Sequence, residues 1–249
     1  MEQPRFLNLG DSALTLEFGD TIDRQLVARV AALDLCLNRE MIAGYLTGVI
    51  EIVPTYRSLT VIFDPLVVRR AVLQERLQQL LDRTEADAEL SARRWSLPIC
   101  YGGEFGPDLE IVAETRGLTS QQVIELHLGQ TYLVYMIGFL PGFPFMGDVA
   151  PALEMPRRTE PRVRVPSGSV AITGQQTAIY PWESPGGWQL LGRCPLRLFD
   201  AEREQPALLA PGDLVAFHAV DAKGFEEIFA EEQRGSLNHG RFLLEEACA

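Results

Sequence analysis

Apolar and polar residues between Arg5 and Ser96 alternate with the periods of both helices and strands. Apolar residues at steps of three and four predict one helix that includes Ile22 to Leu37, capped by Asp20 or Thr21, and a second over 67–83. Short apolar and β-branched runs predict four strands, at residues 6–9, 13–18, 49–53 and 59–63. This order of elements predicts a small α+β unit resembling a split βαβ motif.

The rest of the chain has a different pattern. An apolar strand over 97–101 precedes two short helices, and the second helix is predicted to begin at Thr119, because Gln122 completes a capping-box pattern. Past Gly129 helix signals nearly vanish, and residues 138–195 hold 8 glycines and 9 prolines between short apolar runs. Such interrupted runs predict a β-barrel or a β-sandwich.

A polar, charged segment over 82–94 separates the two patterns. At 249 residues the chain is longer than the usual domain of roughly 100–200 residues. We therefore expect two domains, a small α+β domain over 1–90 and a β-rich domain over 91–249.

Composition excludes several functions. The net charge of −12 argues against a nucleic-acid partner, and no apolar run approaches the roughly 20 residues that span a bilayer. Lys223 is the only lysine, and its context fits neither a P-loop nor a Schiff-base enzyme. The four cysteines are far apart with no CxxC pair, and the N-terminus does not resemble a signal peptide, so we expect a cytoplasmic protein with free thiols.

Arginines are concentrated in one region. Residues 155–199 carry a net charge of +4, and their arginines include Arg158, Arg162 and Arg193. Guanidinium groups suit carboxylates and phosphates, so the region is either an anion-binding surface or a set of solvated strand arginines. Gly186 and Gly187 either offer backbone N–H groups to an anion or form a tight turn.

The run from Gly138 to Gly147 holds Phe139, Phe143 and Phe145 among prolines and glycines. It is too irregular for a normal strand, and it either lines an apolar pocket or partner surface or fills the core.

His127 lies just upstream of this run, and it is either an acid–base group or a helix C-terminal residue that interacts with the helix dipole. The three histidines show no metal-ligand spacing, so no metal site is expected.

Longer motifs resemble one family. They are GFLPGFPFMGDV (138–149), MPRRTEPRVRVPSGSVAITGQQTAIYP (155–181) and SPGGWQLLGRCPLRLFD (184–200), with further matches at 10–23 and 100–109. They resemble the family that includes the B subunit of bacterial ATP-dependent 5-oxoprolinase, the sporulation-kinase inhibitor KipI and allophanate hydrolase subunit one. Ser167, Ala178 and Cys194 depart from the residues more frequent in that family.

The resemblance implies a small α+β domain followed by a cyclophilin-like β-barrel. It also implies a complex with a homologous C subunit and with an A subunit, which together use ATP to open 5-oxo-L-proline to L-glutamate, the isolated chain being inactive. Within that complex Arg158 and Arg162 would bind substrate or phosphate, together with backbone N–H groups of Gly186 and Gly187. Arg193 would be a catalytic residue that also holds carboxylate or phosphate, and His127 would be a catalytic acid–base or positioning residue. The three phenylalanines would shape the pocket or the contact between subunits.

Two other functions remain open from the sequence. The chain is alternatively a KipI-like inhibitor that docks on a histidine kinase, or half of the carboxyltransferase of a biotin-dependent urea carboxylase.

Overall fold

The computed structural model describes residues 4–21, 23–83 and 93–244. It divides the chain into two compact units, Met1–Ser91 and Ala92–Ala249. Most of the boundary segment predicted over 82–94 lies outside the described residues, as do Ile22 and Cys248.

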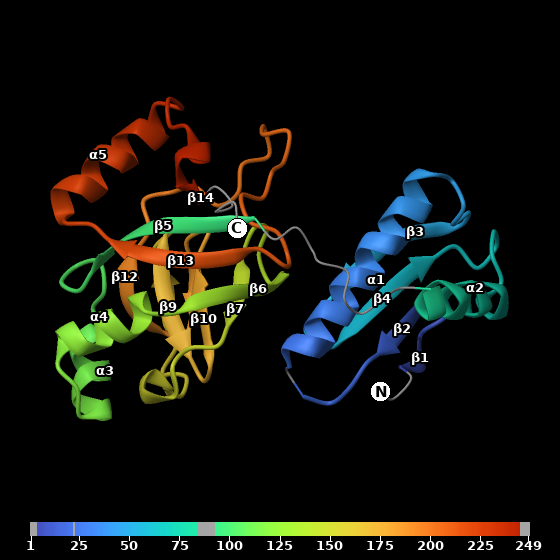
Figure 1. Ribbon diagram of the computed structural model, residues 1–249, viewed down its shortest axis with the longest axis horizontal. Coiled ribbons are helices and arrows are strands. Elements are labelled where there is room, and N and C mark those ends of the chain that lie inside the picture. Colours follow the sequence, from blue (N-terminus) through green and yellow to red (C-terminus); the bar gives the residue numbers. More distant parts are fainter. Residues whose placement is uncertain (1–3, 22, 84–92, 245–249) are drawn as a thin grey trace, which may run out of the picture. The chain divides into compact units, whose positions relative to one another are not determined.

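The first unit is a four-stranded sheet with two helices. Strand β4 pairs antiparallel with both β2 and β3, so β2 and β3 run parallel on either side of it and are joined through α1. This is the predicted split βαβ arrangement, and Figure 1 shows it in blue and cyan. The elements are β1 (Arg5–Leu9), β2 (Ala13–Glu17), α1 (Arg24–Ile42), β3 (Val49–Pro54), β4 (Ser58–Phe63) and α2 (Arg70–Arg83).

The apolar stripe of α1 explains how this helix covers the sheet. Val30, Leu33 and Leu37 from the predicted stripe are buried among the side chains of the sheet. The helix begins later than predicted, because Asp23 is its cap and accepts hydrogen bonds from the backbone N–H groups of Gln25 and Leu26. The capping assignment to Asp20 or Thr21 was therefore wrong.

The second unit is a closed β-barrel, which confirms the predicted α+β class with a barrel domain. Seven strands follow one another in the order β12-β9-β10-β7-β6-β13-β5, and pairing of β12 with β5 closes the ring. The barrel strands are β5 (Arg94–Tyr101), β6 (Thr131–Ile137), β7 (Pro144–Gly147), β9 (Ser169–Thr173), β10 (Gln176–Ile179), β12 (Gln189–Arg193) and β13 (Leu214–Ala219).

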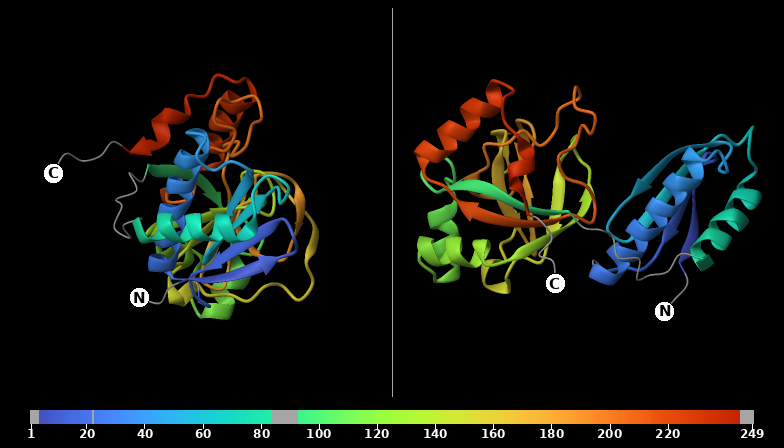
Figure 2. Two further views of the ribbon diagram at one scale, coloured as in Figure 1. Left: turned by 90° about the vertical axis from the view of Figure 1, so that its right-hand side faces the viewer. Right: turned by 45° about the horizontal axis from the view of Figure 1, so that its top comes forward.

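Further elements surround this barrel. In Figures 1 and 2, α3 (Leu109–Arg116) and α4 (Ser120–Leu128) lie together on one side of the β5–β13 pair, and α5 (Ala222–Gln233) lies on the other. Strand β14 (Leu243–Leu244) adds to β5, and β8 (Arg162–Val165) pairs with β11 (Ser184–Gly186) in a separate two-stranded ribbon. Two short 3-10 helices occupy Pro151–Leu153 and His239–Phe242.

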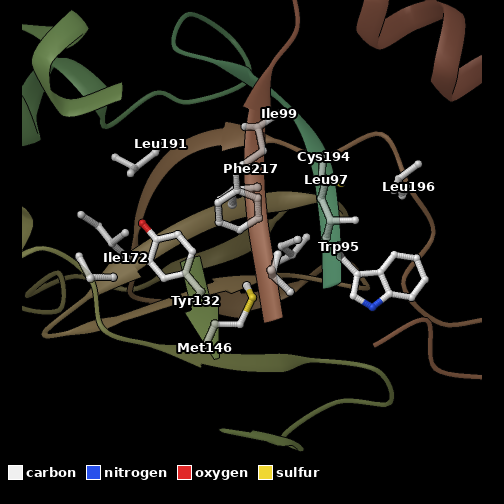
Figure 3. Close-up of a cluster of buried hydrophobic side chains, with 14 of the residues drawn as sticks. Trp95, Leu97, Ile99, Tyr132, Met146, Ile172, Leu191, Cys194, Leu196 and Phe217 are labelled. Carbon is white, nitrogen blue, oxygen red and sulfur yellow. The ribbon is translucent and has the colours of Figure 1, made fainter. Parts of the chain in front are cut away.

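The barrel interior is filled with side chains. Tyr132, Ile172 and Phe217 come from three different strands and meet inside it, and Figure 3 shows their contact region. Because alternate residues of each strand point inward, the short apolar runs of the sequence are enough to fill the core. The barrel is a rigid scaffold, so a site built by its loops and its outer ribbon is held in place.

Two local predictions had different outcomes. Helix α4 has the predicted capping box, in which the side chains of Thr119 and Gln122 each bond to the other's backbone N–H. Helix α5 was missed, although Asp221 caps it by accepting from Gly224 N–H and Phe225 on it is buried. Its early glycine weakened the helix signal.

Candidate substrate pocket

Loops and short strands from residues 139–188 surround a pocket of about 340 Å³ on the barrel unit. One wall comes from the phenylalanine run, a second from the segment before β8, and a third from β11 and the residues after it. We call it the aromatic–arginine pocket; its lining residues are Phe139, Phe143, Phe145, Arg157, Arg158, Pro161, Tyr180, Pro185, Gly186, Gly187 and Trp188.

Phe143 is the centre of the aromatic wall. Its ring is 2% exposed and lies 4.8 Å from the Phe145 ring and 5.0 Å from that of Tyr180, centroid to centroid. Trp188 makes an edge contact with Phe143 at 6.2 Å. Such tilted and edge-on packing fixes the rings in position. The run is not wholly irregular as predicted, because Phe145 lies on barrel strand β7.

Phe139 has a different role at the mouth of the pocket. Its backbone has φ of +67°, a conformation that a bulky side chain rarely adopts, and its side chain is 67% exposed. The turn is held by hydrogen bonds from Leu140 N–H to Gly138 O and from Phe143 N–H to Leu140 O. The surrounding turn thus keeps an aromatic ring in solvent beside the pocket, at a cost in backbone strain.

A buried carboxylate organises the arginine wall. Asp108 is fully buried and accepts hydrogen bonds from both terminal nitrogens of Arg162, at 2.9 and 2.7 Å, and from Arg158 Nη1 at 3.1 Å. It also accepts from the Leu190 N–H at 2.7 Å. Arg157 also lines the pocket, so the three guanidinium charges of this wall exceed the one charge of Asp108, and the wall favours an anion.

The two glycines of the pocket meet different surroundings. A methyl carbon added at Gly186 would lie 2.5 Å from the Tyr180 hydroxyl oxygen, so only glycine fits there. A methyl carbon added at Gly187 would make only ordinary van der Waals contact, 3.7 Å from Pro161, and the Gly187 carbonyl accepts a 2.7 Å hydrogen bond from Arg158 N–H. Binding of an anion by their N–H groups stays a prediction.

His127 lies in the barrel core and does not line the pocket. Its ring stacks on Phe217 with centroids 5.0 Å apart, and its two nitrogens hydrogen bond with Tyr101 Oη at 2.7 Å and Thr177 Oγ1 at 3.1 Å. Burial lowers the pKa of His127 from 6.5 to about 3, so the ring is neutral at pH 7. The acid–base role stays a prediction, and in this position the fully buried ring has no contact with solvent.

Arg193 lines a second, smaller pocket of about 150 Å³ with Ser167, Gly168 and Phe229 of α5. Its Nε donates to Ser167 O at 2.7 Å, and partial burial lowers the pKa of its guanidinium. Its catalytic role is likewise untested. The structure therefore separates Arg193 from the phosphate- and substrate-binding residues with which the sequence grouped it.

Six of the nine predicted site residues line the aromatic–arginine pocket, and Arg162 joins it through Asp108. Sequence reasoning missed Asp108, Tyr180 and Trp188 as site residues. Asp108 and Tyr180 fall inside motifs that carry the family resemblance, which was the available signal. The contact of Asp108 with arginines 50 and 54 positions away becomes visible only in the fold.

Two features are absent from the described part of the chain. Within residues 4–21, 23–83 and 93–244, no group of three His, Cys, Asp or Glu side chains is placed to hold a metal ion. None of the helices there is both long and apolar enough to cross a membrane.

Comparison with known proteins identifies the family. A model described as carboxyltransferase domain, subdomain C and D, matches residues 4–209. The chain is 39% identical to a Bacillus subtilis (strain 168) protein named as the B subunit of 5-oxoprolinase, over 87% of this chain and 93% of that protein. A protein of the same name from Escherichia coli O157:H7 is 40% identical, over 87% and 96%. The chain belongs to the family of 5-oxoprolinase B subunits.

Solved structures agree with this family membership. TTHA0988 is 38% identical and superposes with a TM-score of 0.74 over 84% of this chain. The present chain spans only 40% of the length of TTHA0988. The urea amidolyase of K. lactis shares the fold, with a TM-score of 0.72 at 19% identity. The fold of this chain therefore also occurs within longer chains.

Proposed function

We propose that this chain is the B subunit of an ATP-dependent 5-oxoprolinase complex that opens 5-oxo-L-proline to L-glutamate. The supporting observation is its 39–40% identity, over 87% of its length, to two proteins named as B subunits of 5-oxoprolinase. The name of these relatives implies a complex of several subunits, and we propose a homologous C subunit, together with an A subunit, as the partners. We further propose that the complex acts in the cytoplasm and that the isolated chain is inactive.

The aromatic–arginine pocket supports binding of an acid of this size. 5-Oxo-L-proline is a small ring with one carboxylate, and the pocket offers flat apolar walls beside a positively charged one. Arg158 and Arg162 would bind the substrate or a phosphate, both of them anionic, with help from the N–H groups of Gly186 and Gly187. Arginine forks suit both anions, because they donate parallel hydrogen bonds.

The reaction needs activation of a poor electrophile. ATP would transfer its terminal phosphoryl group to the lactam oxygen and leave as ADP, and water would then add to the ring carbon. Cleavage of the C–N bond would free the amine and leave γ-glutamyl phosphate, which a second water would hydrolyse to glutamate and phosphate. In this scheme Arg193 would stabilise charge that develops on the phosphoryl group or the lactam oxygen, and His127 would act as a positioning residue from the core. ATP is assigned to the complex as a whole.

The greater length of TTHA0988 supports a partner subunit that contacts the present chain directly. There the related fold takes up two fifths of one polypeptide, so a further segment of chain is covalently attached to it. A separate subunit would occupy the corresponding place beside the present chain. The exposed ring of Phe139 gives such a partner an apolar contact next to the pocket.

The test is an omission experiment. This chain is purified with its candidate A and C subunits, assembly is checked by size-exclusion chromatography, and glutamate formed from 5-oxo-L-proline and ATP is measured. We expect turnover by the full set and loss of turnover when this chain is left out. Turnover unchanged by the omission, or none from a verified assembly, would overturn the proposal.

One alternative has an observation in its favour. The matching family model is named for a carboxyltransferase domain, and the fold is shared with urea amidolyase. As half of a urea carboxylase carboxyltransferase, the chain would instead support biotin-dependent carboxylation of urea. Supplying the assembled proteins with a biotinylated carrier, bicarbonate and urea distinguishes the two, because the main proposal predicts no urea-dependent reaction.

A further inference from the structure

Tyr180 places a hydroxyl group in the aromatic–arginine pocket that the fold does not use. The residue follows strand β10 and is 2% exposed, yet among residues 4–21, 23–83 and 93–244 no group hydrogen bonds with its hydroxyl. Tyr132, another buried tyrosine, donates to His127 O at 2.8 Å. The Tyr180 hydroxyl is not among the fully buried polar atoms that lack a partner, so it is open to whatever occupies the pocket and is not committed to the fold.

The hydroxyl is a donor, and positive charge surrounds it. Burial raises the pKa of Tyr180 to about 12, while the nearby guanidinium groups of Arg157 and Arg162 oppose this shift. The phenol therefore keeps its proton at pH 7. Arg162 is engaged with Asp108, whereas Arg157 lines the pocket with no acidic partner among the described residues. The Tyr180 hydroxyl and the Arg157 guanidinium thus both line the pocket, and both can donate hydrogen bonds to a ligand there.

The backbone makes room for this hydroxyl. Gly186 lies against it, and a side chain there would overlap both the hydroxyl and the ring of Tyr180. Gly186 sits in the β8–β11 ribbon opposite Arg162, so the position of the phenol and that of the arginine are set by the same two strands. The arrangement is rigid, since both walls belong to hydrogen-bonded structure.

We infer that the aromatic–arginine pocket binds a small carboxylic acid with a flat or cyclic apolar body, and that Tyr180 and Arg157 bind its carboxylate. Tyr180 Oη donates to one carboxylate oxygen and the Arg157 guanidinium pairs with the group. The apolar body lies against Phe143 and Trp188, whose rings belong to the aromatic wall. This inference rests on the proposed function, because the proposed substrate, 5-oxo-L-proline, is a small cyclic acid of this class.

The test measures binding to the full-length chain alone, by calorimetry with 5-oxo-L-proline as the titrant. We expect saturable binding by the natural chain and at least roughly tenfold weaker binding by Tyr180→Phe, about 1.4 kcal/mol. The melting temperature of Tyr180→Phe should stay equal or rise, because the lost hydroxyl has no partner to leave unpaired. The same titration with 2-pyrrolidone, which keeps the lactam ring and lacks the carboxylate, should show no binding.

Tyr132→Phe is the matched control. It removes a hydroxyl from the barrel core, so it should lower the melting temperature and leave binding of 5-oxo-L-proline unchanged. Equal affinity of Tyr180→Phe and the natural chain, or no saturable binding by the natural chain, would overturn the inference.

The outcomes separate this inference from the proposed function. Glutamate formation by a complex in which this chain shows no Tyr180-dependent binding would leave the function standing and overturn the inference. Tyr180-dependent binding of 5-oxo-L-proline by this chain, together with a complex that forms no glutamate, would support the inference and overturn the proposed function.

Discussion

Arg162 and Asp108 form a bidentate ion pair, with both terminal guanidinium nitrogens within 2.9 Å of the carboxylate oxygens. Asp108 stands just before α3 and Arg162 begins β8, so the pair ties the outer ribbon to the barrel across 54 positions of sequence. The Asp108 carboxylate does not cap its own helix and instead accepts from Leu190 N–H. One buried anion therefore fixes the arginine wall of the pocket.

Asp108→Asn should lower the free energy of unfolding by about 3 kcal/mol or more, because it leaves two arginines without their buried partner. Urea denaturation checks this value. Glu183→Gln is the control, since Glu183 pairs with Arg164 where both side chains are more than half exposed, and it should cost less than about 1 kcal/mol. Similar losses in the two variants would contradict the role given to Asp108.

The two glycines of the pocket should respond differently to one added methyl group. Gly186→Ala should displace Tyr180 and abolish measurable binding of 5-oxo-L-proline, because the methyl carbon would lie 2.5 Å from the hydroxyl oxygen. Gly187→Ala, with its nearest neighbour 3.7 Å away, should change affinity less than about threefold. Calorimetric titration of both variants tests the contrast, and equal affinities would show that the space beside Tyr180 is not limiting.

His127 should make stability depend on pH. Its pKa is about 3 in the folded chain and near 6.5 in the unfolded one, so between these values the unfolded chain binds the extra proton. Stability should fall as the pH decreases from 6.5 towards 3, at up to about 1.4 kcal/mol per pH unit. Urea denaturation from pH 7.5 to 4.5 should give a flatter profile for His127→Gln than for the natural chain.

His218 is the internal control for that profile, since burial lowers its pKa as well and it lies on a different element, strand β13. His218→Gln should retain most of the pH dependence. A natural slope preserved in full by His127→Gln would contradict the buried, neutral histidine.

Arg193→Ala should lower glutamate formation by the assembled complex at least roughly tenfold, a loss of about 1.4 kcal/mol of transition-state stabilisation. Arg164→Ala removes an exposed arginine that pairs with Glu183 and should leave turnover within about twofold. The comparison uses steady-state rates of glutamate formation, measured on complexes that contain each variant at the same subunit stoichiometry. Unchanged turnover with Arg193→Ala would remove Arg193 from the catalytic residues.

Periodicity predicted the first unit well, because its apolar stripes face a single sheet. Leu33 and Leu37 are both fully buried where the α1 stripe placed them. The barrel was predicted only as a class, since strands of four or five residues between prolines and glycines contain no information on which strands pair. Closure by β12 and β5, whose sequences lie about 90 positions apart, depends on contacts that no local pattern encodes.

The site was predicted in part for the same reason. Phe143, Arg158 and Gly186 lie within segments whose composition is unusual, so the sequence alone drew attention to them. Asp108 and Tyr180 lie inside family-like motifs, but nothing in those motifs assigns them a role, and only the fold brings them to the arginines. His127 stood out because histidine is rare here, although its position proved to be in the core.

The most direct test of the account is the rate of glutamate formation as increasing amounts of this chain are added to fixed amounts of the A and C subunits, with 5-oxo-L-proline and ATP. The account predicts no turnover without the chain, a rise with each addition, and a plateau at a fixed molar ratio. Turnover that is the same with and without the chain would contradict it.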